Sequence, residues 1–96
     1  MANTVNSILI NEVDNVATAI VDLHQGDSGR YLAQSGIVEI LILESIPRYH
    51  KFAVRAIRKD EVVRKYGEAI GQAIHDIGAG AHVHIHNIVG PTRQAL

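Results

Sequence analysis

The sequence predicts a small, mainly β domain, and three observations support this prediction. At 96 residues the chain has room for one domain and not for two. Its eight glycines divide it into short segments rich in Val, Ile and Thr, a spacing typical of strands joined by tight turns. Hydrophobic residues make up 47% and charged residues 20%, a balance that indicates a globular chain rather than a disordered one.

The first half of the chain predicts three strands separated by turns. In order, we expect a strand at Ile8–Ile10, a turn at Asp14–Asn15, a strand at Val16–Leu23, a turn at Gln25–Gly29 and a strand at Gly36–Ile46. The last of these is an almost continuous apolar run, which is typical of a strand buried on both faces. Pro47 then ends it, because proline has no backbone N–H to donate.

The second half contains one clear segment and one ambiguous segment. Gly80–Ile88 alternates between polar and apolar residues and predicts a strand. Between Asp60 and Ile77 the apolar residues recur at helical spacing, which favours a helix. Gly67 and Gly71 oppose that helix, since each costs about 1 kcal/mol relative to alanine. Periodicity alone therefore leaves residues 60–77 open between a helix and strands.

Three histidines alternate along the predicted strand Gly80–Ile88. On a strand, His82, His84 and His86 share one face, with neighbours roughly 6.6–6.8 Å apart. Neighbouring imidazoles can bind one ion, whereas His82 and His86, roughly 13 Å apart, cannot. We therefore expect half a metal site, whose other ligands come from another strand or another chain. The alternative is a solvent-exposed face that binds nothing.

A second group of candidate residues follows Pro47. A histidine and a lysine in a turn, here His50 and Lys51, can together hold and protonate an anionic oxygen substrate. Residues 48–65 contain seven basic and two acidic side chains, whereas residues 1–47 contain one basic and six acidic. This local positive charge suits a carboxylate substrate or an acidic partner surface. The alternative is a basic loop that is simply solvated.

Composition excludes several classes of protein. The absence of cysteine excludes disulfides and thiolate chemistry. We expect a cytoplasmic protein without a membrane partner, because no apolar run approaches about 18–20 residues and no signal sequence begins the chain. The chain is slightly acidic overall and poor in aromatic residues, which disfavours nucleic acid as a partner. The nucleophile motif G-x-S-x-G is absent.

Five blocks of the sequence, spread over residues 10–88, carry a resemblance to a known family. In chain order they are Asp14-Asn15-Val16-Ala17, Asp22-Leu23 with Gly26, Ile46-Pro47 with His50-Lys51-Phe52-Ala53, Lys65-Tyr66-Gly67 with Ile70-Gly71, and Gly80 with Val83-His84 and His86-Asn87. The chain resembles the N-terminal domain, or separate small subunit, of altronate and galactarate dehydratases, and also the small subunit of sulfolactate sulfo-lyases. The resemblance implies a single SAF domain over residues 1–96 with a β-clip fold. It also implies two short strands around Tyr66-Gly67.

The resemblance further implies a function. Family members eliminate water from a sugar acid to give a 2-keto-3-deoxy acid, and they depend on a divalent metal, Fe²⁺ or Mn²⁺. The larger catalytic domain is expected in a separate large subunit, which shares the metal with this chain. A homo-oligomer is compatible with this arrangement. The alternatives are a non-catalytic SAF binding or assembly module and the small subunit of a sulfolactate sulfo-lyase.

Individual roles carry over by position in the family motifs. The resemblance implies catalytic roles for His50 and Lys51, and metal ligation by His84 and His86. It implies substrate binding by Tyr66 and Asn87. Arg48-Tyr49 replaces the Ala-Gly that is usual before the histidine of the turn, so the sugar acid stays open.

Overall fold

The computed structural model describes residues 4–90, so residues 1–3 and 91–96 of the expected domain lie outside its description. Residues 4–90 form nine short strands and no helix, which confirms the mainly β fold, and they contain no helix that could cross a membrane. In chain order the strands are β1 (Ser7–Ile8), β2 (Val16–Ala19), β3 (Ser28–Ala33), β4 (Gly36–Leu41), β5 (Lys51–Ala53), β6 (Val62–Lys65), β7 (Glu68–Ala73), β8 (His82–Val83) and β9 (Ile88–Val89).

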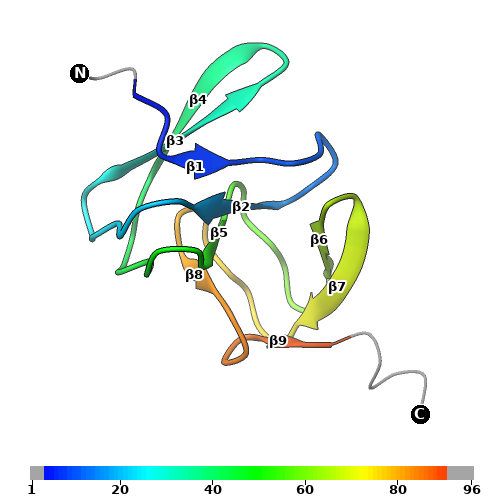
Figure 1. Cartoon of the computed structure of the whole chain (residues 1–96). Coiled ribbons are helices and arrows are strands. Elements are labelled where there is room, and N and C mark those ends of the chain that lie inside the picture. Colours follow the sequence, from blue (N-terminus) through cyan, green and yellow to red (C-terminus); the bar gives the residue numbers. More distant parts are fainter. Residues whose placement is uncertain (1–3, 91–96) are drawn as a thin grey trace.

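The strands form three small antiparallel sheets. The central sheet has the order β1-β2-β5-β8 and joins segments that are far apart in the sequence. The hairpin β3–β4 and the sheet β6-β7-β9 make up the other two. Figure 1 shows the β3–β4 hairpin above the central strands and the β6–β7 hairpin to their right.

Two hydrophobic clusters lie on opposite faces of the central sheet. Alternate residues of a strand point to opposite faces, and on β2 Val16 belongs to one cluster whereas Ala17 belongs to the other. The first cluster joins the central sheet to β6 and β7 through Val63 and Ala73. The second joins it to β3 through Tyr31. The molecule is therefore three layers thick, with the central sheet shared by both cores.

A four-residue turn with the same geometry precedes four of the strands. In each turn the first carbonyl accepts a hydrogen bond of 2.9–3.0 Å from the N–H three residues later, and the third residue has a positive φ angle. These third residues are Gly26, Tyr49, Asp60 and Gly80. The residues before the turns are buried and pair as isolated bridges, Leu23 with Ile46 and Ile57 with Ile77. The same arrangement of bridge, turns and hairpin thus occurs twice in the chain, although the sequence shows no evident repeat.

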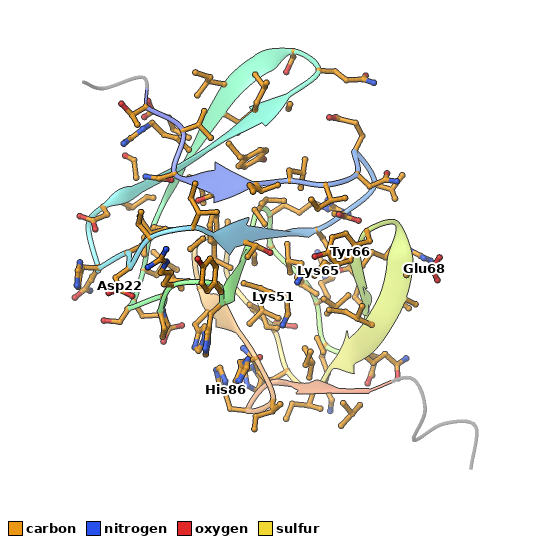
Figure 2. All side chains as sticks on the ribbon, in the orientation of Figure 1. Asp22, Lys51, Lys65, Tyr66, Glu68 and His86 are labelled. Atoms are coloured by element: carbon orange, nitrogen blue, oxygen red, sulfur yellow. The ribbon has the colours of Figure 1, made fainter. Side chains whose placement is uncertain are left out.

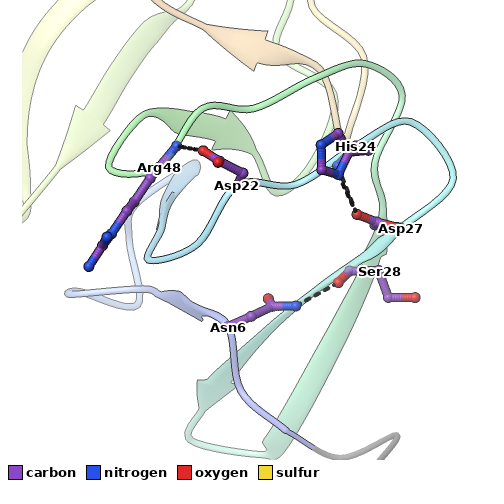
Figure 3. Close-up of polar contacts among 6 residues, drawn as sticks. All are labelled: Asn6, Asp22, His24, Asp27, Ser28 and Arg48. Carbon is purple, nitrogen blue, oxygen red and sulfur yellow. Dashed lines mark hydrogen bonds and ion pairs between the residues drawn. The ribbon is translucent and has the colours of Figure 1, made fainter.

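Two asparagine side chains attach the hairpins to the N-terminal segment. The amide of Asn15 donates to Val62 O (2.9 Å) and its oxygen accepts from Arg64 N (2.8 Å). Asn6 makes the same pair of bonds to Ser28 O and Arg30 N on β3, at 2.9 and 2.8 Å; Figure 3 shows the bond to Ser28. Each side chain occupies the place that a neighbouring strand's peptide would take.

Several predicted elements differ from the observed ones. The strand predicted at Gly36–Ile46 ends at Leu41 and is not buried on both faces, because a two-stranded hairpin packs only one face on the core. The predicted strand Gly80–Ile88 is also wrong, since only His82–Val83 is extended before the chain turns at 84–87. The strand predicted at Val16–Leu23 ends at Ala19, and Leu23 only bridges to Ile46.

Strand β3 was not predicted, because its sequence begins like a turn. Gly29 lies inside it, and a Cβ at this position would lie 2.7 Å from the Phe52 ring. The glycine therefore marks a close approach to a core aromatic and not a turn. The expected turn at Asp14–Asn15 likewise differs, because both residues are buried and the turn ends at Asp14, whose N–H donates to Asn11 O.

The ambiguity over residues 60–77 is settled in favour of strands. The chain pairs β6 with β7 and reverses at Tyr66 and Gly67, both of which have positive φ angles. The buried carboxylate of Asp14 accepts from the backbone N–H groups of Tyr66 (3.0 Å) and Gly67 (2.8 Å). This contact stabilises a left-handed conformation that tyrosine rarely adopts.

We predict that Asn15→Asp lowers the free energy of unfolding by about 2–4 kcal/mol. The substitution keeps the acceptor for Arg64 N but replaces the donor to Val62 O with a carboxylate oxygen in a buried position. Urea denaturation measures the effect. Gln25→Glu is the matched control, because it makes the same change from amide to carboxylate at an exposed residue of the turn before β3. Equal stability of the two variants would contradict the assigned role of Asn15.

Candidate metal-binding site

The turn at residues 47–50 positions His50 at the start of β5. His50 N donates to Pro47 O (2.9 Å), and Tyr49 has a φ angle of 71°. The Asp22 carboxylate accepts from Arg48 N at 2.8 Å, so a separate loop holds the turn in place (Figure 3). This contact gives a physical reason for the aspartate in the motif Asp22-Leu23.

A second turn, at residues 84–87, gathers the other histidines. Asn87 is buried, its amide donates to His82 O (2.8 Å) and its oxygen accepts from His84 N (2.9 Å). These bonds fold the chain back immediately after Val83, and Figure 2 shows His86 in the loop between β8 and β9. Gly80, with a φ of 89°, is required before β8, because a Cβ there would collide with Leu41 O.

Four imidazole rings meet where these two turns converge. His50 Nδ1 lies 2.9 Å from His82 Nε2, so one ring donates a hydrogen bond and the other accepts it. The ring centroids of His50 and His84 are 4.4 Å apart, and those of His82 and His84 are 5.5 Å apart. The centroids of His82 and His86 are 5.2 Å apart, so the expected separation of roughly 13 Å is wrong, although among the described residues the group that could hold one ion contains His82 and not His86. The turn brings together residues that a straight strand would separate.

The geometry of three of these rings suits a metal ion. His50, His82 and His84 each offer a ring nitrogen, and the three ligand atoms lie within 4.8 Å of one another. Imidazole nitrogens bound to one ion at about 2.1 Å lie at most about 4.2 Å apart, so small ring rotations are sufficient. Three protein ligands leave coordination positions open, as catalytic metal sites do. All three residues are half-buried, which leaves access for a further ligand.

The electrostatics of the cluster favour the neutral form of two of its rings, His82 and His84. Burial lowers the pKa of His82 below its usual value, and His50, His86 and His84 lower it further, against an opposing effect of Glu44. The pKa of His84 is lowered by partial loss of solvent and by the charges of His50, Lys51 and His86. Neutral imidazoles are the form that binds a metal ion.

The remaining predicted site residues, Lys51, Tyr66 and Asn87, lie in three different environments. Lys51 is half-buried on β5 next to His50, and burial followed by the charge of Lys65 lowers its pKa. Tyr66 is 58% exposed at the tip of the β6–β7 hairpin, with the Lys65 ammonium 4.9 Å from its ring centroid (Figure 2). Asn87 uses its side chain on the backbone of the histidine turn, so the structure gives it a positioning contact.

Two residues of this region, His82 and Lys65, are not among the site residues predicted from the sequence. His82 was noticed in the histidine alternation, but only its pairing opposite Phe52 in the β5–β8 register brings it to His50. Lys65 belongs to the block Lys65-Tyr66-Gly67, and its proximity to Lys51 follows from the packing of β6 on the central sheet. Both contacts are long-range and depend on topology.

Comparison with known proteins gives consistent matches. The family model of the altronate/galactarate dehydratase SAF domain matches residues 5–91. The altronate dehydratase of Escherichia coli is 42% identical over 80 residues, and that of Bacillus subtilis is 39% identical over 80 residues. In both cases the match covers 83% of this chain and 15% of the relative, so the chain spans a small fraction of those proteins.

A further relative is similar in size to this chain. The (2R)-sulfolactate sulfo-lyase subunit alpha of Chromohalobacter salexigens is 30% identical over 84 residues. That match covers 83% of this chain and 89% of the relative. The module therefore occurs both as part of a long polypeptide and as a subunit of about this length.

We predict that stability falls on acidification and that His82 contributes to the fall. The folded-state pKa of His82 lies below the usual 6.5, so between these values the unfolded chain binds more protons. Stability from this group is present at higher pH and is lost as the pH falls through that window. Urea midpoints at about pH 8 and about pH 5.5 measure the loss, which His82→Gln should reduce. His75→Gln, outside the cluster, should leave this loss of stability unchanged. An equal loss in His82→Gln and in the unmodified chain would contradict the prediction.

Proposed function

The chain belongs to the altronate/galactarate dehydratase SAF domain family, and from this premise we propose that it is the small subunit of a metal-dependent hydro-lyase. In this proposal it acts in the cytoplasm on a sugar acid such as altronate or galactarate, which loses water to give a 2-keto-3-deoxy acid. A separate large subunit supplies the rest of the active site. The match to a (2R)-sulfolactate sulfo-lyase subunit alpha over 89% of its length supports that division, whereas in the altronate dehydratases the matched module is 15% of one longer protein.

The observation that carries the proposal is the convergence of His50, His82 and His84. Two turns from distant parts of the chain place three imidazole nitrogens within 4.8 Å of one another. We propose these three residues as the ligands of a divalent ion, Fe²⁺ or Mn²⁺. Of the ligand pair predicted from the sequence, His84 and His86, this set retains His84. His86 lies beside His82 and is available to a ligand or to the partner subunit.

Elimination of water next to a carboxylate needs a base for the α-proton and an acid for the departing hydroxyl. A bound divalent ion supplies Lewis-acid polarisation of substrate oxygens. His50 is assigned here to the ligand set, where its contact with His82 can orient the two rings. Lys51, next to it and with a lowered pKa, can donate a proton or hold an anionic oxygen.

A second candidate function is the small subunit of a sulfolactate sulfo-lyase. The match to a named alpha subunit over 89% of its length supports this alternative. Both reactions eliminate a group β to a carboxylate, so the same histidine cluster and lysine suit either. The two candidates differ in the leaving group, which is water in one case and sulfite in the other.

We predict that the chain alone produces no 2-keto acid from altronate or galactarate, and that adding the large subunit and Mn²⁺ or Fe²⁺ restores turnover. Release of sulfite from (2R)-sulfolactate in the same assay would identify the second candidate. A chelator should abolish either activity. Turnover by the chain alone would contradict the subunit proposal. Binding of these acids by the chain alone, without any turnover when the large subunit is added, would favour a binding module.

Variants test the ligand set in the same assay. We expect His84→Ala and His50→Gln to lower reconstituted turnover by at least about 100-fold, because each removes one of three ligands. Paramagnetic resonance of Mn²⁺ should show weaker binding in these variants. His24→Gln is the matched control, since His24 is exposed and contacts only Asp27 among the described residues. Full activity of His84→Ala would exclude the cluster as the metal site.

A further inference from the structure

We propose that Lys51 and Lys65 together form a binding site for the anionic head group, carboxylate or sulfonate, of a small hydroxy acid. The inference rests on the proposed function and names the part of the chain that recognises the acid. Lys65 has no role in the ligand set or in the proton transfers proposed above. Figure 2 shows the two side chains next to each other between β5 and the β6–β7 hairpin.

The fold brings the two lysines to the same layer. In the register, Lys51 lies opposite both Thr18 and Val83, and Val83 is buried in the cluster that joins the central sheet to β6 and β7. Lys65 follows the buried Val63 by two residues, so it shares the face of β6 that is directed at the central sheet. Both lysines are half-buried, whereas Arg64 between these two β6 positions is exposed.

The pair has no anionic partner in the part of the chain that the structure describes. Within residues 4–90, the ion pair found within 4.0 Å joins His24 and Asp27. The nearby Asp14 carboxylate is buried and accepts three backbone N–H groups, from Asn11, Tyr66 and Gly67. Glu68 lies opposite Lys65 in the register, but Figure 2 shows it on the outer side of the hairpin.

Two half-buried cations that repel each other raise the free energy of the site, and an anion between them lowers it. Both side chains lie on the side of the central sheet that carries the cluster with Val63 and Val83, so their charges repel each other. Lys51 directly follows His50 in the chain, so the cationic site borders the imidazole cluster. An acid whose head group lies between the lysines would thus extend its neighbouring hydroxyl groups towards the histidines. Tyr66, under the Lys65 ammonium, would flank the same acid.

Binding to the complete chain without the large subunit tests the site directly. The probes are galactarate and sulfolactate, with galactitol as the neutral analogue that keeps the hydroxyl groups of galactarate. We expect the acids to shift the NMR signals of the Lys51 and Lys65 side-chain methylenes, and galactitol to leave them unchanged. We expect Lys65→Gln and Lys51→Gln to weaken acid binding by about tenfold, the value of one charge-assisted hydrogen bond.

Two further variants make the result decisive. Lys59→Gln removes a lysine that is exposed and lies in the turn before β6, and it should bind within about twofold of the unmodified chain. Lys65→Arg keeps the charge and should restore most of the affinity lost in Lys65→Gln. Unchanged binding by Lys65→Gln, or an equal loss in Lys59→Gln, would overturn the inference.

The outcome separates this inference from the proposed function. Acid binding that depends on both lysines, without turnover in the presence of the large subunit, would support the site and remove the proposed reaction. Turnover with a KM unaffected by Lys65→Gln would support the reaction and remove the site. Binding of 3-hydroxypropionate and of isethionate, which differ only in carrying a carboxylate or a sulfonate, identifies the preferred head group in either case.

Discussion

The structure depends on asparagine side chains that bond to two backbone groups of one strand. Asn6, Asn15 and Asn87 each donate to the carbonyl of one residue and accept from the N–H two residues later. The strands are too short to form long ladders, so these amides satisfy the polar groups that a longer neighbouring strand would otherwise pair. Asn6 and Asn15 attach the two hairpins, and Asn87 folds the histidine turn. A domain of this size thus fixes its layers with few residues.

The same arrangement explains why the site lies where it does. Each half of the chain contains a buried bridge, a turn with a positive φ angle and a hairpin, and the aspartate before a bridge accepts from the other turn. Asp22 does this for Arg48, and Asp76 does it for Lys59. The strands that follow the Tyr49 and Gly80 turns, β5 and β8, are paired in the central sheet. The histidines therefore meet where the two halves of the fold join.

Sequence patterns predicted the fold class because glycine and proline mark the turns. They also indicated His50, Lys51 and His84 as candidate site residues, because these stand in recognisable blocks. The patterns could not predict the strand at Ser28–Ala33. Gly29 marks a position where a Cβ would collide with the Phe52 ring, and not a turn. Alternation misled at Gly80–Ile88, because two hydrogen bonds from a single buried amide, Asn87, override it. The proximity of Lys51 to Lys65 depends on how hairpins pack on a shared sheet, which no local pattern encodes.

The chemical groups of the candidate site indicate which groups a partner would have to supply. Its functional groups are imidazoles and ammonium groups, from His50, His82, His84, Lys51 and Lys65. Within the described residues, Glu44 is the carboxylate that influences the cluster, and it accepts from the backbone N–H of His82. Elimination from an acid with a non-acidic α-proton calls for a base positioned on the substrate, and a hard divalent ion is held best with oxygen ligands as well as nitrogen. A module that offers cations and imidazoles is therefore complementary to a surface that offers carboxylates, and this complementarity supports the proposed division of one active site between two polypeptides.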